Sequence, residues 1–297
     1  IWPPSTRPSA PFDKIETMVG QKNNHNKATY SWTFLQSKLG CKIGHGKANE
    51  GCRRGRYIVR IIDAHAHIGY FGGFFNVGIT ADELVRQMDE YNIEKAVLCA
   101  LNNEDTKAAV RKHPGRFVGL AWVNPWDGPK AVEEARRYIE MEGFKGIKLH
   151  PLLHAFVAND DVVHPIAEAA REMRVPLFIH SGHPPFSLPW SIAQLAELFP
   201  DVKMVMIHMG HGHGVYIQAA IDMAKKYPNL YLETSGMPMH TKIKEGYEGV
   251  GHDRIMFGTD APFHHPSVEI QRSRVSGLNE AQLEDLFYNN IVKLLGI

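Results

Sequence analysis

The chain has few cysteines, no long apolar run and almost no net charge. Its three cysteines, Cys41, Cys52 and Cys99, are too few and too scattered over 297 residues for a disulfide framework. No apolar run approaches the roughly 18 residues that cross a bilayer, and the first residues show no signal-peptide pattern. The formal net charge of +1 creates no strong field toward nucleic acid or an anionic membrane. We therefore expect a cytoplasmic protein that binds neither nucleic acid nor a membrane.

Histidine, in contrast, is abundant. The chain has 17 histidines beside 33 lysines and arginines and 32 acidic residues. Their longest run is the pair His264 and His265, so a purification tag does not explain them. Histidine is the commonest metal ligand and the usual proton carrier near neutral pH. The composition therefore indicates metal or acid–base chemistry, and the positions of the histidines must show where it takes place.

The chain divides into two parts by composition. Residues 1–56 begin with four prolines in eleven residues and continue through polar and Gly, Lys and Arg-rich stretches without apolar periodicity. We interpret them as an irregular N-terminal extension of unknown role. This part holds His25, Cys41, His45 and Cys52, but their spacing matches no common zinc finger. Residues 57–297 read as one domain.

In that domain, short β-rich runs alternate with amphipathic helical stretches, which is typical of βαβ units and a parallel sheet. We predict strands at residues 57–65, 95–100, 117–123, 144–150, 175–180, 202–208, 230–234 and 254–258. Thr80 and Glu83 predict a capping box at the start of one helix. Further helices are predicted at residues 130–142, 160–173, 191–199 and 215–227, with a closing helix at 279–295. Eight repeats favour an α/β fold of the closed (β/α)8 type, the TIM barrel; an open doubly wound sheet is the alternative.

Polar residues gather at one end of these strands. Active sites of such barrels lie at the C-terminal ends of the strands, and five of the eight predicted strands place His or Asp there. These residues are His65, His67, His150, His180, His208 and Asp260. His65 and His67 are two residues apart, so they project from one face of an extended segment. Scattered core histidines would not share one end of the strands.

The alternation of side chains adds a lysine to this end of the barrel. Ile147 and Leu149 suit the helix-facing side of their strand, so Lys148 and His150 are expected to point into the barrel. The same alternation turns Glu233 inward. Imidazole nitrogen and carboxylate oxygen suit Zn²⁺, with Mn²⁺ as the alternative. The predicted metal ligands are His65, His67, His180 and Asp260.

Five motifs occur in a recognisable order: DAHAH at residues 63–67, GIKLHP at 146–151, IHSG at 179–182, IHMG at 207–210 and GTDAP at 258–262. With them the chain resembles the amidohydrolase superfamily, in particular the amidohydrolase-related group that includes aminocarboxymuconate-semialdehyde decarboxylase. The resemblance covers about residues 58–297. It implies His65, His67 and His180 as metal ligands, Asp260 as ligand or proton carrier, and His208 as an acid–base residue. In binuclear members a carbamylated lysine bridges two ions; Lys148 lies on the matching strand, and an ion-paired interior lysine is the other account.

The predicted function is that of a metal-dependent hydrolase. A bound ion lowers the pKa of its water to about 7, Asp260 accepts the proton, and His208 stabilises the developing charge. The expected substrate is a small, carboxylated ester, lactone or amide. The alternative is a metal-dependent decarboxylase; Schiff-base chemistry at Lys148 and a non-enzymatic metal-binding protein are further hypotheses. The expected substrate-binding residues are Phe71, Trp122, Lys148, His150 and His183, and a homo-oligomer stays open.

Overall fold

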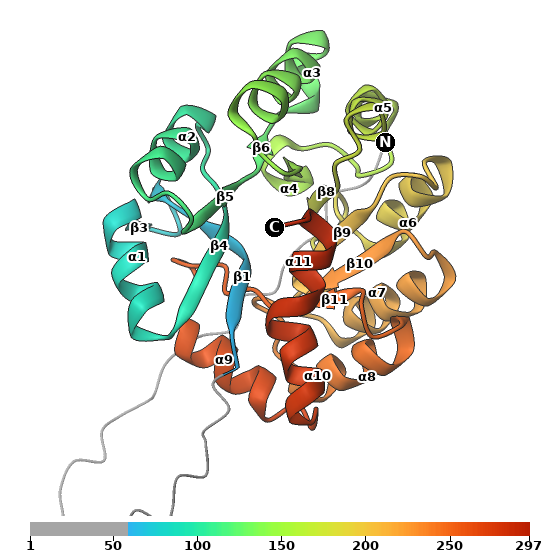
Figure 1. Ribbon diagram of the computed structural model, residues 1–297. Helices are drawn as coiled ribbons and strands as arrows, with labels where there is room; N and C mark the ends of the chain where they lie inside the picture. Colours follow the sequence, from blue (N-terminus) through green and yellow to red (C-terminus); the bar gives the residue numbers. More distant parts are fainter. Residues whose placement is uncertain (1–58) are drawn as a thin grey trace, which may run out of the picture. The chain divides into compact units, whose positions relative to one another are not determined.

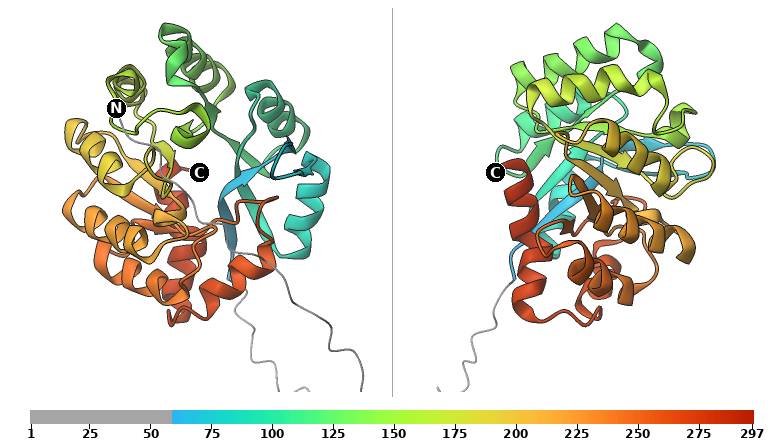
Figure 2. Two further views of the ribbon diagram at one scale, coloured as in Figure 1. Left: turned by 180° about the vertical axis from the view of Figure 1, so that it is seen from behind. Right: turned by 90° about the vertical axis from the view of Figure 1, so that its right-hand side faces the viewer.

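The computed structural model describes residues 59–297, in which strands and helices alternate around a closed barrel (Figures 1 and 2). The predicted extension, residues 1–56, lies outside the described residues, so its boundary stays a prediction. All eight predicted strands are present. They are β1 (Ile61–His67), β4 (Ile93–Cys99), β5 (Phe117–Gly119) continued by β6 (Ala121–Trp122), β7 (Ile147–Leu149), β8 (Leu177–His180), β9 (Met204–Ile207), β10 (Leu230–Glu233) and β11 (Ile255–Met256).

The strands are parallel and each pairs with its neighbours in chain order, from β1 through β4 and β5 and from β6 to β11. The last strand meets the first. Ala64 donates its backbone N–H to Phe257 at 2.9 Å, and His67 donates to Ala261 at 2.7 Å. This seam between β11 and β1 closes the sheet, so the fold is the predicted (β/α)8 TIM barrel and not the open sheet.

Helices cover the outside of the barrel. They are α1 (Ala81–Glu90), α2 (Asn103–Lys112), α3 (Pro129–Arg136), α4 (Pro151–His154), α5 (His164–Met173), α6 (Pro189–Leu198), α7 (Gly214–Lys226), α8 (His240–Val250) and α9 (Pro266–Arg274). The capping box of Thr80 and Glu83 at the start of α1 is confirmed. The sequence analysis did not predict α2, α4, α8 and α9. No helix among residues 59–297 is long and apolar enough to cross a membrane.

The C-terminal segment closes one end of the barrel. The predicted closing helix consists of α10 (Glu280–Glu284), a π-helical turn (Asp285–Asn289) and α11 (Asn290–Leu295). Ile291 and Leu294 of α11 pack in one apolar cluster with Ile62 and Phe178 of the barrel interior. The opposite end carries a hairpin of β2 (Gly69–Phe71) and β3 (Val77–Ile79), as the side view in Figure 2 shows. The C-terminal ends of the strands therefore remain free for a site.

The first strand does not alternate regularly. Ile62 and Ala64 belong to the interior cluster, whereas Ala66 belongs to the cluster between strands and helices. The pairing of β1 with β4 shifts register between Asp63 and Ala66, which is a β-bulge. Bulges re-aim side chains next to active sites. Because of this bulge, the side chain of His65 points to the barrel mouth, although the preceding Ala64 also lies on the interior side of the strand.

Candidate metal centre

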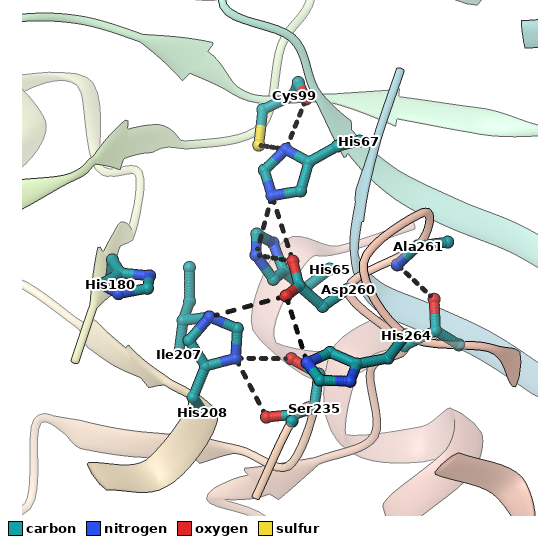
Figure 3. A network of polar contacts seen from close by, with 12 residues as sticks. His65, His67, Cys99, His180, Ile207, His208, Ser235, Asp260, Ala261 and His264 are labelled. Carbon is teal, nitrogen blue, oxygen red and sulfur yellow. Dashed lines mark hydrogen bonds and ion pairs between the residues drawn. The ribbon is translucent and has the colours of Figure 1, made fainter. Parts of the chain in front are cut away.

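Three donor atoms converge at the barrel mouth around Asp260, which follows β11 (Figure 3). Its Oδ1 lies 3.2 Å from His65 Nε2 and 3.3 Å from His67 Nε2. The two Nε2 atoms are 3.1 Å apart, and all three side chains are buried. The backbone of Asp260 has a φ of 57°, a left-handed conformation that costs free energy and is found at functional sites. Its N–H donates to the carbonyl of His65 at 2.7 Å, which holds the strained loop against β1.

These distances fit a divalent cation. Ligand atoms about 2.1 Å from one ion stand about 3.0–3.4 Å from each other. The His67 Nδ1–H donates to the carbonyl of Cys99 at 2.9 Å, so its Nε2 faces the other two donors and would present a lone pair to a bound cation. His65 Nδ1 is buried without a partner among the described residues. Burial alone would raise the pKa of Asp260, but His208, His65 and His67 hold it well below its usual range. The donor set is therefore one that a cation would stabilise.

His208, at the end of β9, faces the same carboxylate from the other side. Its Nε2 lies 4.0 Å from Asp260 Oδ2, and its Nδ1 lies 2.9 Å from both the carbonyl and the Oγ of Ser235. A carbonyl only accepts, so Nδ1 carries the hydrogen and Nε2 presents a lone pair. Burial lowers the pKa of His208 to about 3, so the ring is neutral at pH 7. Glu233 accepts from the His208 N–H at 3.1 Å and from Ser235 Oγ at 2.7 Å, which fixes this arrangement.

His180, the fourth predicted ligand, does not contact the three donors directly and lies next to His208. Its ring centroid is 4.8 Å from that of His208. Its Nε2, however, lies 2.8 Å from His183 Nδ1. Its other face stacks on His150 at 3.9 Å. His183 in turn contacts His211 at 4.5 Å between ring centroids. The structure thus brings three of the four predicted ligands into mutual contact and places the fourth beside them.

Lys148 is wholly buried beneath these residues. Its Nζ lies 3.4 Å from His65 Nε2 and 5.7 Å from the centroid of the Trp122 ring. The alternative of an ion-paired interior lysine is not borne out, because no acidic side chain of residues 59–297 forms an ion pair with Lys148. Burial lowers its pKa. His150 stacks on Trp122 with nearly parallel planes, 5° apart, so the two predicted substrate-binding residues form one wall.

Aromatic rings surround His67 on the open side. The ring of Trp122 is 5.5 Å from that of His67, and the ring of Phe71, in the hairpin, is 5.6 Å away. Phe263 lies 5.8 Å from His67 and 4.8 Å from Phe71. Phe71 and Trp122 were expected to line the substrate pocket, whereas Phe263 was not predicted. His264, also unselected, places its Nε2 3.8 Å from Asp260 Oδ2; its position four residues after Asp260 was the only signal.

Comparisons with known proteins identify the family of this chain. The model of the amidohydrolase family matches residues 62–297. The gamma-resorcylate decarboxylase of Polaromonas sp. is 25% identical over 289 residues, which cover 72% of this chain and 86% of the relative. The 2-amino-3-carboxymuconate-6-semialdehyde decarboxylase of Dictyostelium discoideum is 21% identical over 236 residues, covering 66% of this chain and 65% of the relative.

A solved structure shares the fold. The 5-carboxyvanillate decarboxylase of Novosphingobium aromaticivorans, in complex with manganese and 4-hydroxy-3-methoxy-5-nitrobenzoic acid, superposes with a TM-score of 0.66 at 17% identity. The match covers 82% of this chain and 97% of that enzyme.

Proposed function

The chain belongs to the amidohydrolase family, and from that premise we propose that it is a metal-dependent decarboxylase of a small aromatic carboxylate. This is the alternative of the sequence prediction, and it takes precedence over hydrolysis because the curated relatives named above are decarboxylases. The observation that carries it is that Phe71, Trp122 and Phe263 surround His67, one of the proposed metal ligands. A planar aromatic acid fits between such rings, because offset and edge-to-face contacts stabilise it there.

The ion would be held by His65, His67 and Asp260, with His180 as the fourth ligand. The mixed nitrogen and oxygen donors suit Mn²⁺ as well as Zn²⁺. We propose Mn²⁺, since manganese is bound in the related 5-carboxyvanillate decarboxylase. When bound, the ion supplies positive charge that orients and polarises anionic oxygens of the substrate.

Asp260 and His208 form the proton-carrying pair. Decarboxylation breaks a C–C bond, leaves the electron pair on the ring carbon and requires a proton there in place of CO₂. Asp260 Oδ2 and His208 Nε2 are 4.0 Å apart and face the same space, so the pair would take a proton from water and pass it to the carbon of a ring placed between them as CO₂ leaves. Because the Ser235 carbonyl accepts the hydrogen of His208 Nδ1, the lone pair of Nε2 faces this space and is able to accept the proton first.

Hydrolysis is the second candidate, because the same neutral His208 and ionised Asp260 are able to take a proton from water. The test incubates manganese-loaded protein with 2,6-dihydroxybenzoate, 5-carboxyvanillate and a panel of esters and lactones. We expect CO₂ release from at least one aromatic acid and no acid release from the esters. Acid release without CO₂ would replace the decarboxylase by a hydrolase.

A further inference from the structure

Lys148 is a buried lysine that forms no ion pair among residues 59–297, although Asp260 and Glu233 act on it from a greater distance. It is 0% exposed, and its one polar partner is His65 Nε2 at 3.4 Å. The nearest acidic groups are otherwise engaged: Asp260 faces His65 and His67, and Glu233 accepts from Ser235. A buried charge is expensive unless it is paired. An anionic oxygen placed next to Lys148 would therefore stabilise its ammonium form.

The proposed metal ion would increase the stabilisation that an anionic oxygen next to Lys148 provides. An ion held by His65 Nε2 and the ammonium of Lys148 would both lie close to the same nitrogen atom, and like charges in a buried site repel strongly. An anionic oxygen between them would attract both charges at once. No protein oxygen fills that role toward Lys148 in residues 59–297.

Trp122 supplies a second donor without a partner. Trp122 is only 6% exposed. Its indole Nε1 is buried and makes no hydrogen bond within the described residues. The backbone of Trp122 is clamped by Asn103, which donates to its carbonyl and accepts from its N–H, both at 2.8 Å. Buried indole N–H groups usually find an acceptor. Two unmatched donors, one charged and one neutral, thus lie on neighbouring strands β6 and β7.

The geometry points to an anion subsite made by Lys148 and Trp122, which binds an anionic oxygen of the substrate on the side of the metal that faces β6 and β7. This inference rests on the proposed function, since it assigns the polar end of the same substrate. It makes Lys148 a determinant of specificity for anionic over neutral aromatic compounds. In this proposal the surrounding aromatic side chains bind the ring of the substrate, and the subsite favours substrates that carry a negative charge.

The test measures binding to the full-length, manganese-loaded protein by calorimetry, with 2,6-dihydroxybenzoate as the anionic probe and 2,6-dihydroxybenzamide as its neutral analogue. Lys148→Met keeps the length of the side chain but removes its charge, and Trp122→Phe keeps a ring but removes the N–H. Lys145→Met, at an exposed lysine just before β7, is the matched control. Manganese affinity is measured for each variant.

We expect Lys148→Met to bind the anionic probe about 10- to 100-fold more weakly, because a charge-assisted hydrogen bond is lost. The neutral probe should change much less, and manganese affinity should stay equal or rise, since a nearby positive charge is removed. Trp122→Phe should weaken the anion by a smaller factor, and Lys145→Met should change nothing.

Three results would overturn the subsite: unchanged anion affinity in Lys148→Met, equal loss of both probes, or a wild-type protein that binds neither. Loss of manganese together with the anion would show that Lys148 merely supports His65. Failure of the decarboxylase proposal looks different. A protein that releases no CO₂, yet loses anion affinity selectively in Lys148→Met, keeps the subsite and refutes the reaction.

Discussion

Asp63 and Thr259, 196 residues apart in the chain, join the first and last strands of the barrel next to the proposed metal ligands His65 and Asp260. Asp63 Oδ1 accepts the backbone N–H of Thr259 at 2.8 Å and that of His65 at 3.0 Å, and its Oδ2 accepts the Thr259 hydroxyl. His65 and Asp260 are each one or two residues from this pair. The seam that closes the barrel therefore also sets the distance between two of the proposed ligands.

Asp63→Ala should weaken both the fold and the metal centre. It leaves two buried N–H groups without their acceptor, and each such group costs about 1–3 kcal/mol. A few kcal/mol in a domain of this size lowers the Tm by several degrees. Thermal unfolding and manganese titration measure the two effects, and Asp161→Ala, at a fully exposed carboxylate, is the control. Equal Tm and metal affinity in both variants would show that the seam is held by the backbone alone.

Asp260→Asn should affect turnover more than metal content. The amide keeps the size and one oxygen ligand but removes the basicity, and loss of a general acid–base group costs on the order of 10²–10⁴-fold in kcat. His65→Ala should instead empty the site, because it deletes a nitrogen donor at the centre of the cluster. The measurement pairs kcat with metal analysis at one pH. If Asp260→Asn turns over normally with full metal, His208 alone carries the proton.

The fold was largely predictable from the sequence, because strand runs and capping signals are local. The unpredicted helices are those with weak local signals: α8 contains Gly246 and Gly249, which are poor helix formers, and α2 is mostly polar. These helices form because their few apolar residues pack on the barrel.

The site was predictable in part. We predicted that His65, His67, His208 and Asp260 lie together because each follows the end of a strand, and the structure confirms their proximity. Parallel strands in a barrel bring their C-terminal ends together. The direction of the His180 ring depends on its neighbours His150 and His183, which spacing does not reveal. Phe263 lies in a loop without periodicity, and it reaches His67 only because the seam to β1 folds that loop back.

Stability should fall as the pH rises from about 5 to 8, in part through Glu269 of α9. Burial raises its pKa from 4.5 to about 7, against the opposing effect of Arg272. The folded state therefore holds this proton more tightly than the unfolded state, and the resulting stability is present below pH 4.5 and lost as the pH passes through 7. A shift of this size corresponds to on the order of 2–3 kcal/mol.

Glu269→Gln tests this, because the amide is neutral at every pH. Its free energy of unfolding, from urea titrations at pH 5 and pH 8, should vary less with pH than that of the wild type. Glu140→Gln, at an exposed glutamate, should retain the wild-type dependence. If the free energy of unfolding changes between pH 5 and pH 8 by the same amount in Glu269→Gln and in the wild type, Glu269 is ionised in the folded protein.

The most direct test of the account is the rate of CO₂ release from hydroxylated benzoates before and after removal of metal. The protein is stripped with a chelator, assayed, and assayed again after Mn²⁺ is restored, with His67→Ala treated in parallel. We predict that release is abolished by the chelator, returns with Mn²⁺ in the wild type and does not return in His67→Ala. CO₂ release that survives complete metal removal, or a metal-loaded protein that decarboxylates none of these acids, would contradict the account.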